Sequence, residues 1–322
     1  MKKFSQSLLA GLALAVAALP AFAQADYPKQ PIKLVVGFAP GGGTDILARM
    51  VSVPLAERLG VPVTVENKAG ASGTIANMAV KNAPADGYTL LIGASGAMTI
   101  NPAVQSDLPY DPIKDYEPIT VLGTYPIVFS AKPELPVQTT RDLIAYAKAK
   151  PGALNTGGAG VLFQLTGELL NQQAGISTTY VAYRGTAPAI TAVLGGEIDV
   201  LVADVAPSLP LIESKRIRPI AITSAKRSKN LPDVPTLAES GLPGFEVDVF
   251  VGLFARKGTP QAIVDRIYRE VAAIVSSEEM QDKMEKMGIS ASGITPAQTA
   301  ALVQRDLKKY TEAARRGNIK VQ

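Results

Sequence analysis

The chain has 322 residues, of which 32 are Lys or Arg and 28 are Asp or Glu, and it contains neither cysteine nor histidine. Without these two residue types it has no thiolate nucleophile, no imidazole base and no disulfide, and we expect no metal ion and no cofactor. The net charge of +4 comes without a Lys/Arg cluster interleaved with aromatic residues, so we expect no nucleic-acid partner. An enzyme that uses carboxylates alone or a Ser-Lys pair stays open as an alternative, although neither a Ser-x-x-Lys nor a Gly-x-Ser-x-Gly motif occurs.

The first residues have the pattern of a secretory signal peptide. Residues 1–3 (Met-Lys-Lys) are a charged start, residues 8–19 are apolar but too few to cross a bilayer, and residues 21–23 (Ala-Phe-Ala) form a typical cleavage site. We therefore expect residues 1–23 to be removed and the mature chain, of about 300 residues, to be periplasmic and to form two domains. No second apolar stretch reaches the roughly 20 residues of a membrane span.

Residues 40–45, Pro-Gly-Gly-Gly-Thr-Asp, are the first candidate binding motif. They follow the short apolar run 32–36 and precede a helical pattern at 46–50. A strand, a run of glycines and a Thr or Asp that can cap a helix predict a strand-to-helix turn with free backbone N–H groups. Such a turn can hold an anion.

The same order of features recurs about thirty residues later. The apolar run 61–66 leads into residues 67–74 (Asn-Lys-Ala-Gly-Ala-Ser-Gly-Thr) and a helix, and 88–92 is a third strand followed by a Gly/Ser-rich turn at 93–97. This alternation predicts a parallel sheet, whose loops at the carboxyl ends of the strands share one crevice. Glycine-rich turns also serve packing alone, so a structural role is the alternative.

The rest of the chain predicts a second α/β unit between two crossings. The apolar segments 119–122 and 127–130 look like a strand that leaves one domain for the other, and 247–254 looks like the return. Between them, residues 155–160 predict another glycine-rich turn of the kind that follows the strands of the first half. Three helical patterns then close the chain, at 260–275, 278–287 and 296–316.

Five motifs occur together and in order along the mature chain, at 40–45 with 48–49, 67–73, 84–91, 231–239 and 241–244. On these motifs the chain resembles the Bug family, the periplasmic receptors of tripartite tricarboxylate transporters. The resemblance implies an α/β, two-domain type II periplasmic binding protein fold with parallel-type sheets, two interdomain crossings and C-terminal helices. We expect one domain to comprise residues 24–124 and 249–322, and the other residues 125–248.

The resemblance also implies a small carboxylate ligand in the interdomain cleft, held by backbone amides, small hydroxyls and water. The motifs of the first domain place ligand contacts at Gly42, Gly43, Thr44, Asp45, Ala69, Gly70, Ala71 and Ser72. Those of the opposing domain place them at Gly158, Ala159, Gly160, Thr186, Ala187 and Asp204. Apart from the resemblance, four aromatic residues at strand ends or crossings are candidates to wall the cleft, each with a core position as the alternative: Phe38, Tyr125, Phe163 and Phe250.

Two departures from the family's pattern bear on the ligand. Where the family's distal loop usually offers hydroxyls, this chain has glycines followed by Val161, Leu162 and Phe163, and the family's usual Trp on the returning crossing is Phe250. A less polar pocket is implied, which weakens an assignment to citrate. It favours a mono- or dicarboxylate with an apolar or aromatic body.

Three charged residues each have two interpretations. Asp45 either contacts the ligand or caps the first helix, and because its charge repels a carboxylate we favour the cap and take Thr44 as the contact. Arg184 either pairs with the ligand or forms a solvated or interdomain salt bridge. Asp204 either accepts a hydrogen bond from an amine or hydroxyl of the ligand or makes a hinge hydrogen bond.

These inferences together predict a monomeric receptor that captures a small carboxylate by hinge closure and passes it to the membrane permease of a tripartite transporter. The same clamp in another class of protein would present its ligand to a sensor kinase without a transport role. The carboxylate-based enzyme is the third alternative.

Overall fold

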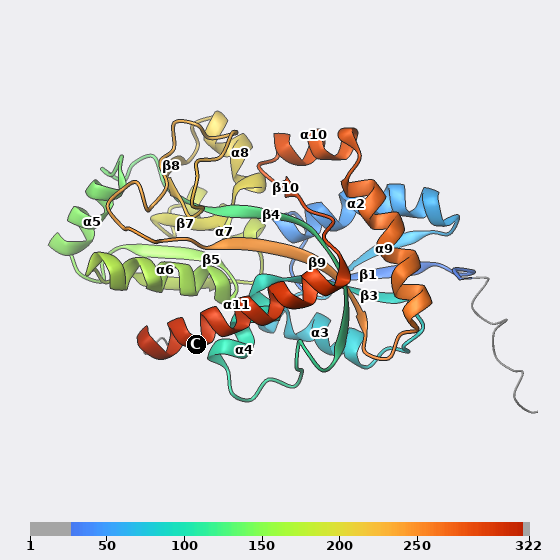
Figure 1. The fold of residues 1–322 in the computed structure, drawn as a ribbon. Helices are drawn as coiled ribbons and strands as arrows, with labels where there is room; N and C mark the ends of the chain where they lie inside the picture. The colour runs from blue at the N-terminus through green and yellow to red at the C-terminus, as the bar shows by residue number, and fades with distance from the viewer. Residues whose placement is uncertain (1–26, 318–322) are drawn as a thin grey trace, which may run out of the picture.

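The computed structural model describes residues 27–317, which form two α/β lobes joined by two shared strands, β4 and β9 (Figure 1). The signal peptide predicted at residues 1–23 lies outside the described residues. The strands form a hydrogen-bonded sheet in the order β2-β1-β3-β9-β4-β7-β5-β6, and β8 and β10 also pair with β4. Figure 1 shows the first lobe, with β1 and α2, on the right and the second lobe, with α5 and α6, on the left.

The first lobe contains the predicted parallel strands. β1 pairs in parallel with both β2 and β3, and its apolar residues are buried on both faces, as is usual for a parallel strand covered by helices. The elements of this lobe are β1 (Ile32–Val36), α2 (Gly43–Leu59), β2 (Val63–Asn67), η1 (Ala71–Gly73), α3 (Thr74–Lys81), β3 (Thr89–Ala94), η2 (Gly96–Ile100), α4 (Asn101–Val104), α9 (Gln261–Val275), α10 (Glu278–Lys286), β10 (Ser290–Ala291) and α11 (Pro296–Gly317). The three helices expected at the end of the chain are therefore confirmed as α9, α10 and α11.

The start of α2 differs from the prediction. The helix begins at Gly43, so Thr44 and Asp45 lie in its first turn and Gly42 is the N-cap, without a side-chain capping bond. The expectation that Thr44 or Asp45 caps this helix with its side chain is therefore wrong. The helix already starts at the last glycine of the run, and both residues lie inside its first turn.

The second lobe repeats the parallel arrangement. β5 lies between β6 and β7 and pairs in parallel with both. The elements of this lobe are α5 (Thr140–Ala149), β5 (Asn155–Ala159), α6 (Val161–Ala174), β6 (Thr179–Tyr183), α7 (Thr186–Leu194), β7 (Val200–Asp204), α8 (Val205–Glu213) and β8 (Arg218–Ile222).

The prediction of a glycine-rich turn at 155–160 is wrong for most of that segment, which is strand β5. A Cβ atom on Gly157 would lie 2.8 Å from Ile198 Cδ1 and 3.0 Å from Tyr183 Cε2. The glycines are therefore required by close packing inside the sheet and not by a turn. Only Gly160, with a φ of +80°, makes the turn into α6.

Two long strands carry the chain between the lobes. β4 (Tyr116–Ala131) pairs antiparallel with β9 (Asp248–Arg256) through residues 116–126, and with β7 and β8 through residues 127–131. The two predicted crossings are present, and the two apolar segments expected at the first crossing belong to one continuous strand. Because these strands run from one lobe to the other and back, the sheet is antiparallel at its centre and parallel on either side.

Thr223 joins the two crossings where they enter the second lobe. Its hydroxyl accepts a hydrogen bond from Ile127 N at 2.9 Å and donates to the carbonyl oxygen of Val247 at 2.5 Å. Its backbone bonds to the same two residues, N–H to Ile127 O and C=O to Val247 N, each at 3.0 Å. The side chain is fully buried, so these hydrogen bonds are shielded from solvent.

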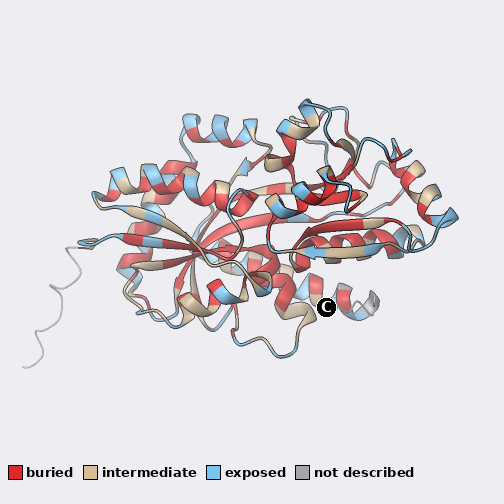
Figure 2. Cartoon of the chain, turned by 180° about the vertical axis from the view of Figure 1, so that it is seen from behind, coloured by how far each residue is buried: buried red, intermediate tan, exposed pale blue. Residues whose placement is uncertain are grey.

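Burial follows the sheet through both lobes. Figure 2 shows buried residues along the central strands and exposed residues on the outer faces of the helices. The stripe Ile263, Ile267, Val271 and Ile274 of α9 is buried, as its helical spacing predicts. Within residues 27–317, no helix has both the length and the apolar character that a membrane crossing requires.

Candidate functional site

A cavity lies between the lobes, at the carboxyl ends of β1, β3, β5 and β7. The space between its lining residues that protein atoms do not fill is about 430 Å³, and this figure includes space open to solvent. It is lined by Phe38, Gly42, Gly43, Thr44, Ser72, Ala94, Gly96, Tyr125, Ala159, Val161, Leu162, Phe163, Thr186, Asp204 and Val249. These residues come from both lobes and from both crossing strands, so the cavity exists only where the lobes meet.

A carboxylate of the protein itself occupies the N-terminus of α2. The backbone N–H of Gly43, the first residue of the helix, donates to Asp204 Oδ2 at 2.9 Å. Asp204 is the last residue of β7 in the second lobe, and only 4% of it is exposed. Since a helix N-terminus attracts negative charge, this contact is a charge-assisted bond between the lobes.

Asp204 has further donors around it. Thr186 Oγ1 donates to Asp204 Oδ2 at 3.1 Å, and the hydroxyl of Tyr125 also bonds to the carboxylate. Burial raises the pKa of Asp204, and the three hydrogen bonds from Gly43, Thr186 and Tyr125 only partly oppose this shift. Burial, and then the charge of Asp204, raise the pKa of Tyr125 well above its ordinary value, so its hydroxyl stays protonated.

The second glycine-rich loop has an unusual backbone. All four residues of 70–73 have positive φ, including Ala71 at +45° and Ser72 at +51°, where side chains are disfavoured. Two side-chain amides bond to the carbonyl oxygens of this loop. The buried amide of Asn101 donates to Ser72 O, and that of Asn77 donates to Gly73 O, each at 3.0 Å. These bonds keep the Ser72 side chain at the cavity wall.

Asp45 does not line the cavity, because its carboxylate is used inside the first lobe. Its Oδ2 accepts hydrogen bonds from Gly41 N and Arg49 Nε, each at 3.0 Å, and its Oδ1 accepts one from Asn67 Nδ2 at 2.8 Å. Burial by itself would raise the pKa of Asp45, but these hydrogen bonds outweigh it and hold the pKa below its ordinary value. The carboxylate therefore fixes the shape of the first loop.

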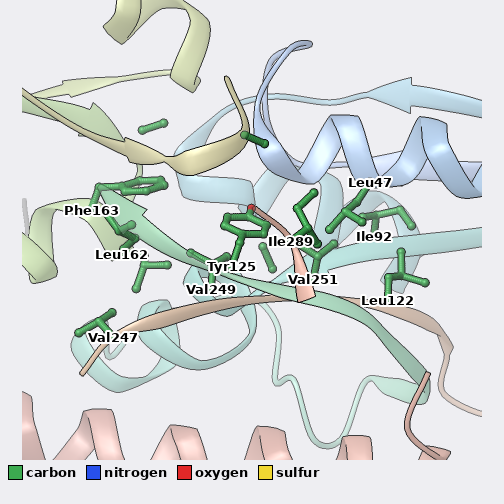
Figure 3. Close-up of a cluster of buried hydrophobic side chains, with 14 of the residues drawn as sticks. Leu47, Ile92, Leu122, Tyr125, Leu162, Phe163, Val247, Val249, Val251 and Ile289 are labelled. Atoms are coloured by element: carbon green, nitrogen blue, oxygen red, sulfur yellow. The ribbon is translucent and has the colours of Figure 1, made fainter. Parts of the chain in front are cut away.

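Apolar and aromatic side chains form much of the wall. Figure 3 shows Leu162 and Phe163 on one side of Tyr125 and Val249, with Leu47 and Ile92 on the other. Phe38 also lines the cavity, whereas Phe250 is buried in the core and does not. No Lys or Arg is among the lining residues, and the described part of the chain has no cluster of acidic residues suited to a metal ion.

The structure brings many of the predicted site residues to the cavity. Those among its lining residues are Phe38, Gly42, Gly43, Thr44, Ser72, Ala159, Phe163, Thr186 and Asp204. Those that do not line it are Asp45, Ala69, Gly70, Ala71, Gly158, Gly160 and Ala187. Arg184 is exposed and also lies outside the lining.

Some of the non-lining residues lie where the lobes meet. A Cβ atom on Gly160 would be 3.2 Å from Phe38 Cε1, and a Cβ atom on Gly41 would be 3.7 Å from Ala187 Cβ. Ala94, Gly96 and Val249 also line the cavity and were not predicted from the sequence. Ala94 and Gly96 belong to the glycine-rich turn predicted at 93–97, which could have indicated them. Nothing in the sequence distinguishes Val249 from the other apolar residues of its strand.

The lobes are in contact around the cavity, so the arrangement is a closed one. A Cβ atom on Gly185 would lie 2.7 Å from Ala39 Cβ of the other lobe. Elsewhere between the lobes, Lys229 forms an ion pair with Glu285 of α10, and Asn230 Nδ2 donates to the carbonyl oxygen of Lys286 at 2.7 Å.

Comparison with known proteins gives a consistent set of relatives. Residues 47–318 match the family described as tripartite tricarboxylate transporter family receptor. The structure of the periplasmic binding protein BugD is 32% identical, with a TM-score of 0.87 over 92% of this chain and 100% of that one. Rpa4515 of R. palustris with adipate is 34% identical, with a TM-score of 0.89 over 92% and 99% of the two chains. MatC of Rhodopseudomonas palustris with bound malate is 30% identical, with a TM-score of 0.85 over 89% and 99%.

Proposed function

Because the chain belongs to the tripartite tricarboxylate transporter receptor family, we propose that it is a periplasmic receptor that binds a small carboxylate between its lobes and delivers it to a membrane permease. The family membership confirms the resemblance on which the sequence analysis relied. The likeness to BugD likewise confirms the two-domain periplasmic binding protein fold. The matched family and these neighbours are solute-binding proteins and not enzymes.

The observation that carries the proposal is the composition of the interlobe cavity. It combines the hydroxyls of Thr44 and Ser72, the backbone of the loop 70–73, and a wall without any Lys or Arg. Backbone dipoles and hydroxyls can replace part of the hydration shell of a carboxylate without a cationic side chain. We assign the ligand contacts to the predicted residues that line the cavity, and we retain the domain boundaries 24–124 with 249–322 and 125–248, and the monomeric state, as parts of the proposal.

The ligand class follows from the wall and from the relatives. Adipate in Rpa4515 and malate in MatC are small dicarboxylates. In this chain Val161, Leu162 and Phe163 present apolar surface to the cavity, which supports a mono- or dicarboxylate with an apolar body.

Native mass spectrometry of the purified protein, followed by calorimetric titration, tests this function. We expect either a copurified small acid or micromolar binding of at least one member of a series of aliphatic and aromatic mono- and dicarboxylates, equivalent to about 8 kcal/mol. A neutral sugar or a cationic amine of similar size is the control. Failure of every acid to bind the refolded, ligand-free protein contradicts the proposal.

A further inference from the structure

We propose that Asp204 fills the anion position at the N-terminus of α2, and that the receptor therefore selects acids that present a hydrogen-bond donor, and not a second carboxylate, to this end of the cavity. The donor is a hydroxyl or an amine at the far end of an apolar body. This inference rests on the proposed function and narrows its ligand class.

The first step is that Asp204 already occupies the N-terminus of α2. A ligand carboxylate approaching α2 would seek the N–H of Gly43, but that N–H already donates to Asp204 Oδ2 at 2.9 Å. Asp204 is held there by Thr186 and Tyr125 as well, from two other elements. A ligand anion could take the position only by displacing a carboxylate with three donors.

The second step is the absence of compensating charge in the lining. Among the described residues that line the cavity there is no Lys or Arg, Arg184 is exposed outside it, and Arg49 is bonded to Asp45. A second carboxylate beside Asp204 would thus be a like charge next to a buried one.

The third step is the remaining hydrogen-bonding capacity of Asp204. A carboxylate offers about four lone-pair sites, and Gly43, Thr186 and Tyr125 use three of them. The remaining site suits one donor from the ligand. The hydroxyl of Ser72 and the backbone of its loop then receive the ligand's single carboxylate, with Leu162 and Phe163 against the body between.

Matched probes test this assignment by calorimetry. One set is adipate, 6-hydroxyhexanoate and 6-aminohexanoate, and a shorter set is succinate, 4-hydroxybutyrate and 4-aminobutyrate. In the wild type we expect the hydroxyl or amine member of a set to bind roughly tenfold or more tightly than the dicarboxylate of the same length. Asp204→Asn keeps an acceptor for Gly43 and Thr186 but removes the charge, so the dicarboxylate should gain roughly tenfold and the amine should lose its advantage.

Two further variants separate charge from structure. Asp265→Asn removes an equal charge from the exposed face of α9 and should leave every affinity at the wild-type value. Asp204→Ala removes the interlobe hydrogen bond as well as the charge. If Asp204→Asn and Asp204→Ala weaken all probes equally, Asp204 acts only on closure and the inference is overturned. Preference of the wild type for the dicarboxylate overturns it too, while leaving the proposed function intact. Failure of the wild type to bind any probe in either set also overturns the inference, whereas the proposed function fails only if every acid of the wider series fails to bind.

Discussion

The side-chain amide of Asn67 donates a hydrogen bond to the carboxylate of Asp45 at 2.8 Å, and this contact joins the two glycine-rich loops of the first lobe. Asn67 ends β2 directly before the second loop, and Asp45 lies in the first turn of α2. The same amide also donates to the carbonyl oxygen of Phe38 at 3.0 Å. The relative position of the two loops is therefore set by a polar network around the buried carboxylate of Asp45.

Asp45→Ala should lower the free energy of unfolding by about 2 kcal/mol, because it removes a buried carboxylate that accepts three hydrogen bonds from partly buried groups. The affected donors are Gly41 N and Asn67 Nδ2, and Arg49 loses its ion pair. Denaturant unfolding measures the loss. Asp45→Asn retains one acceptor oxygen and should lose less, while Asp265→Ala on the surface is the control. A loss for Asp45→Ala no larger than that of the control would contradict the structural role.

Gly43→Ala should prevent full closure of the lobes. Gly43 has ordinary helical geometry, so alanine costs nothing in conformation, but its Cβ would lie 2.7 Å from Tyr125 Oη and 3.1 Å from Asp204 Cγ. We expect roughly tenfold weaker binding, about 1.4 kcal/mol, of the best acid found by titration. X-ray scattering should show that the wild type becomes more compact at saturation and the variant does not.

The matched control for Gly43→Ala is Gly167→Ala in α6, where the nearest atom to the added Cβ is 3.9 Å away. This variant should bind and compact as the wild type does. Wild-type affinity and compaction in Gly43→Ala would show that the contact at the start of α2 is not needed for the bound state.

The stability of the protein should depend on pH through Asp204. Its pKa is raised in the folded state, so the native protein binds this proton more readily than the unfolded chain does. The contribution of Asp204 to the free energy of unfolding is then largest at low pH and falls as the pH rises through the raised pKa. Tyr125 is the other titratable group in the lining, and it stays protonated throughout this range.

Asp204→Asn isolates this effect. The variant lacks the titration, so its stability relative to the wild type should be most favourable above the raised pKa of Asp204 and should decline as the pH is lowered. Unfolding curves recorded over a series of pH values measure the difference. A relative stability that increases on acidification has the opposite sign and contradicts the assignment.

Citrate should bind worst among citrate, succinate, glutamate and benzoate. Its additional carboxylates would lie against Val161, Leu162 and Phe163, where an unpaired buried charge costs several kcal/mol. A competition series against one labelled acid ranks the four. Citrate as the tightest ligand would mean that this apolar wall does not decide selectivity.

Much of the fold was predictable from hydrophobic spacing and from the resemblance. The β1–α2–β2 and β3 pattern, the two crossings and the helices α9 to α11 all come from apolar runs with a clear period. Strand β5 was missed because Gly157 and Gly158 have no side chains from which a period can be read. The residues that require them to be glycines, Ile198 and Tyr183, are distant in sequence.

The site was predictable as a set of loops but not as a set of contacts. Asp204 and Gly43 are 161 positions apart, and only the completed sheet brings the end of β7 against the start of α2. The sequence left both interpretations of Asp204 open, because its hydrogen-bond partners lie on three separate elements. Likewise, no local pattern distinguishes the hydroxyl of Tyr125 at the cavity from a core aromatic residue.

The junction at Thr223 has a mechanical consequence. Because Ile127 and Val247 are hydrogen-bonded to the same buried residue, the two connections are held side by side there, and we expect the lobes to rotate about an axis close to that residue. A rotation about this axis would change two contacts between the lobes together, the hydrogen bond of Gly43 with Asp204 and the ion pair of Lys229 with Glu285. We therefore expect that a partner in contact with both lobes on the outside would detect whether the cavity is occupied without reaching it.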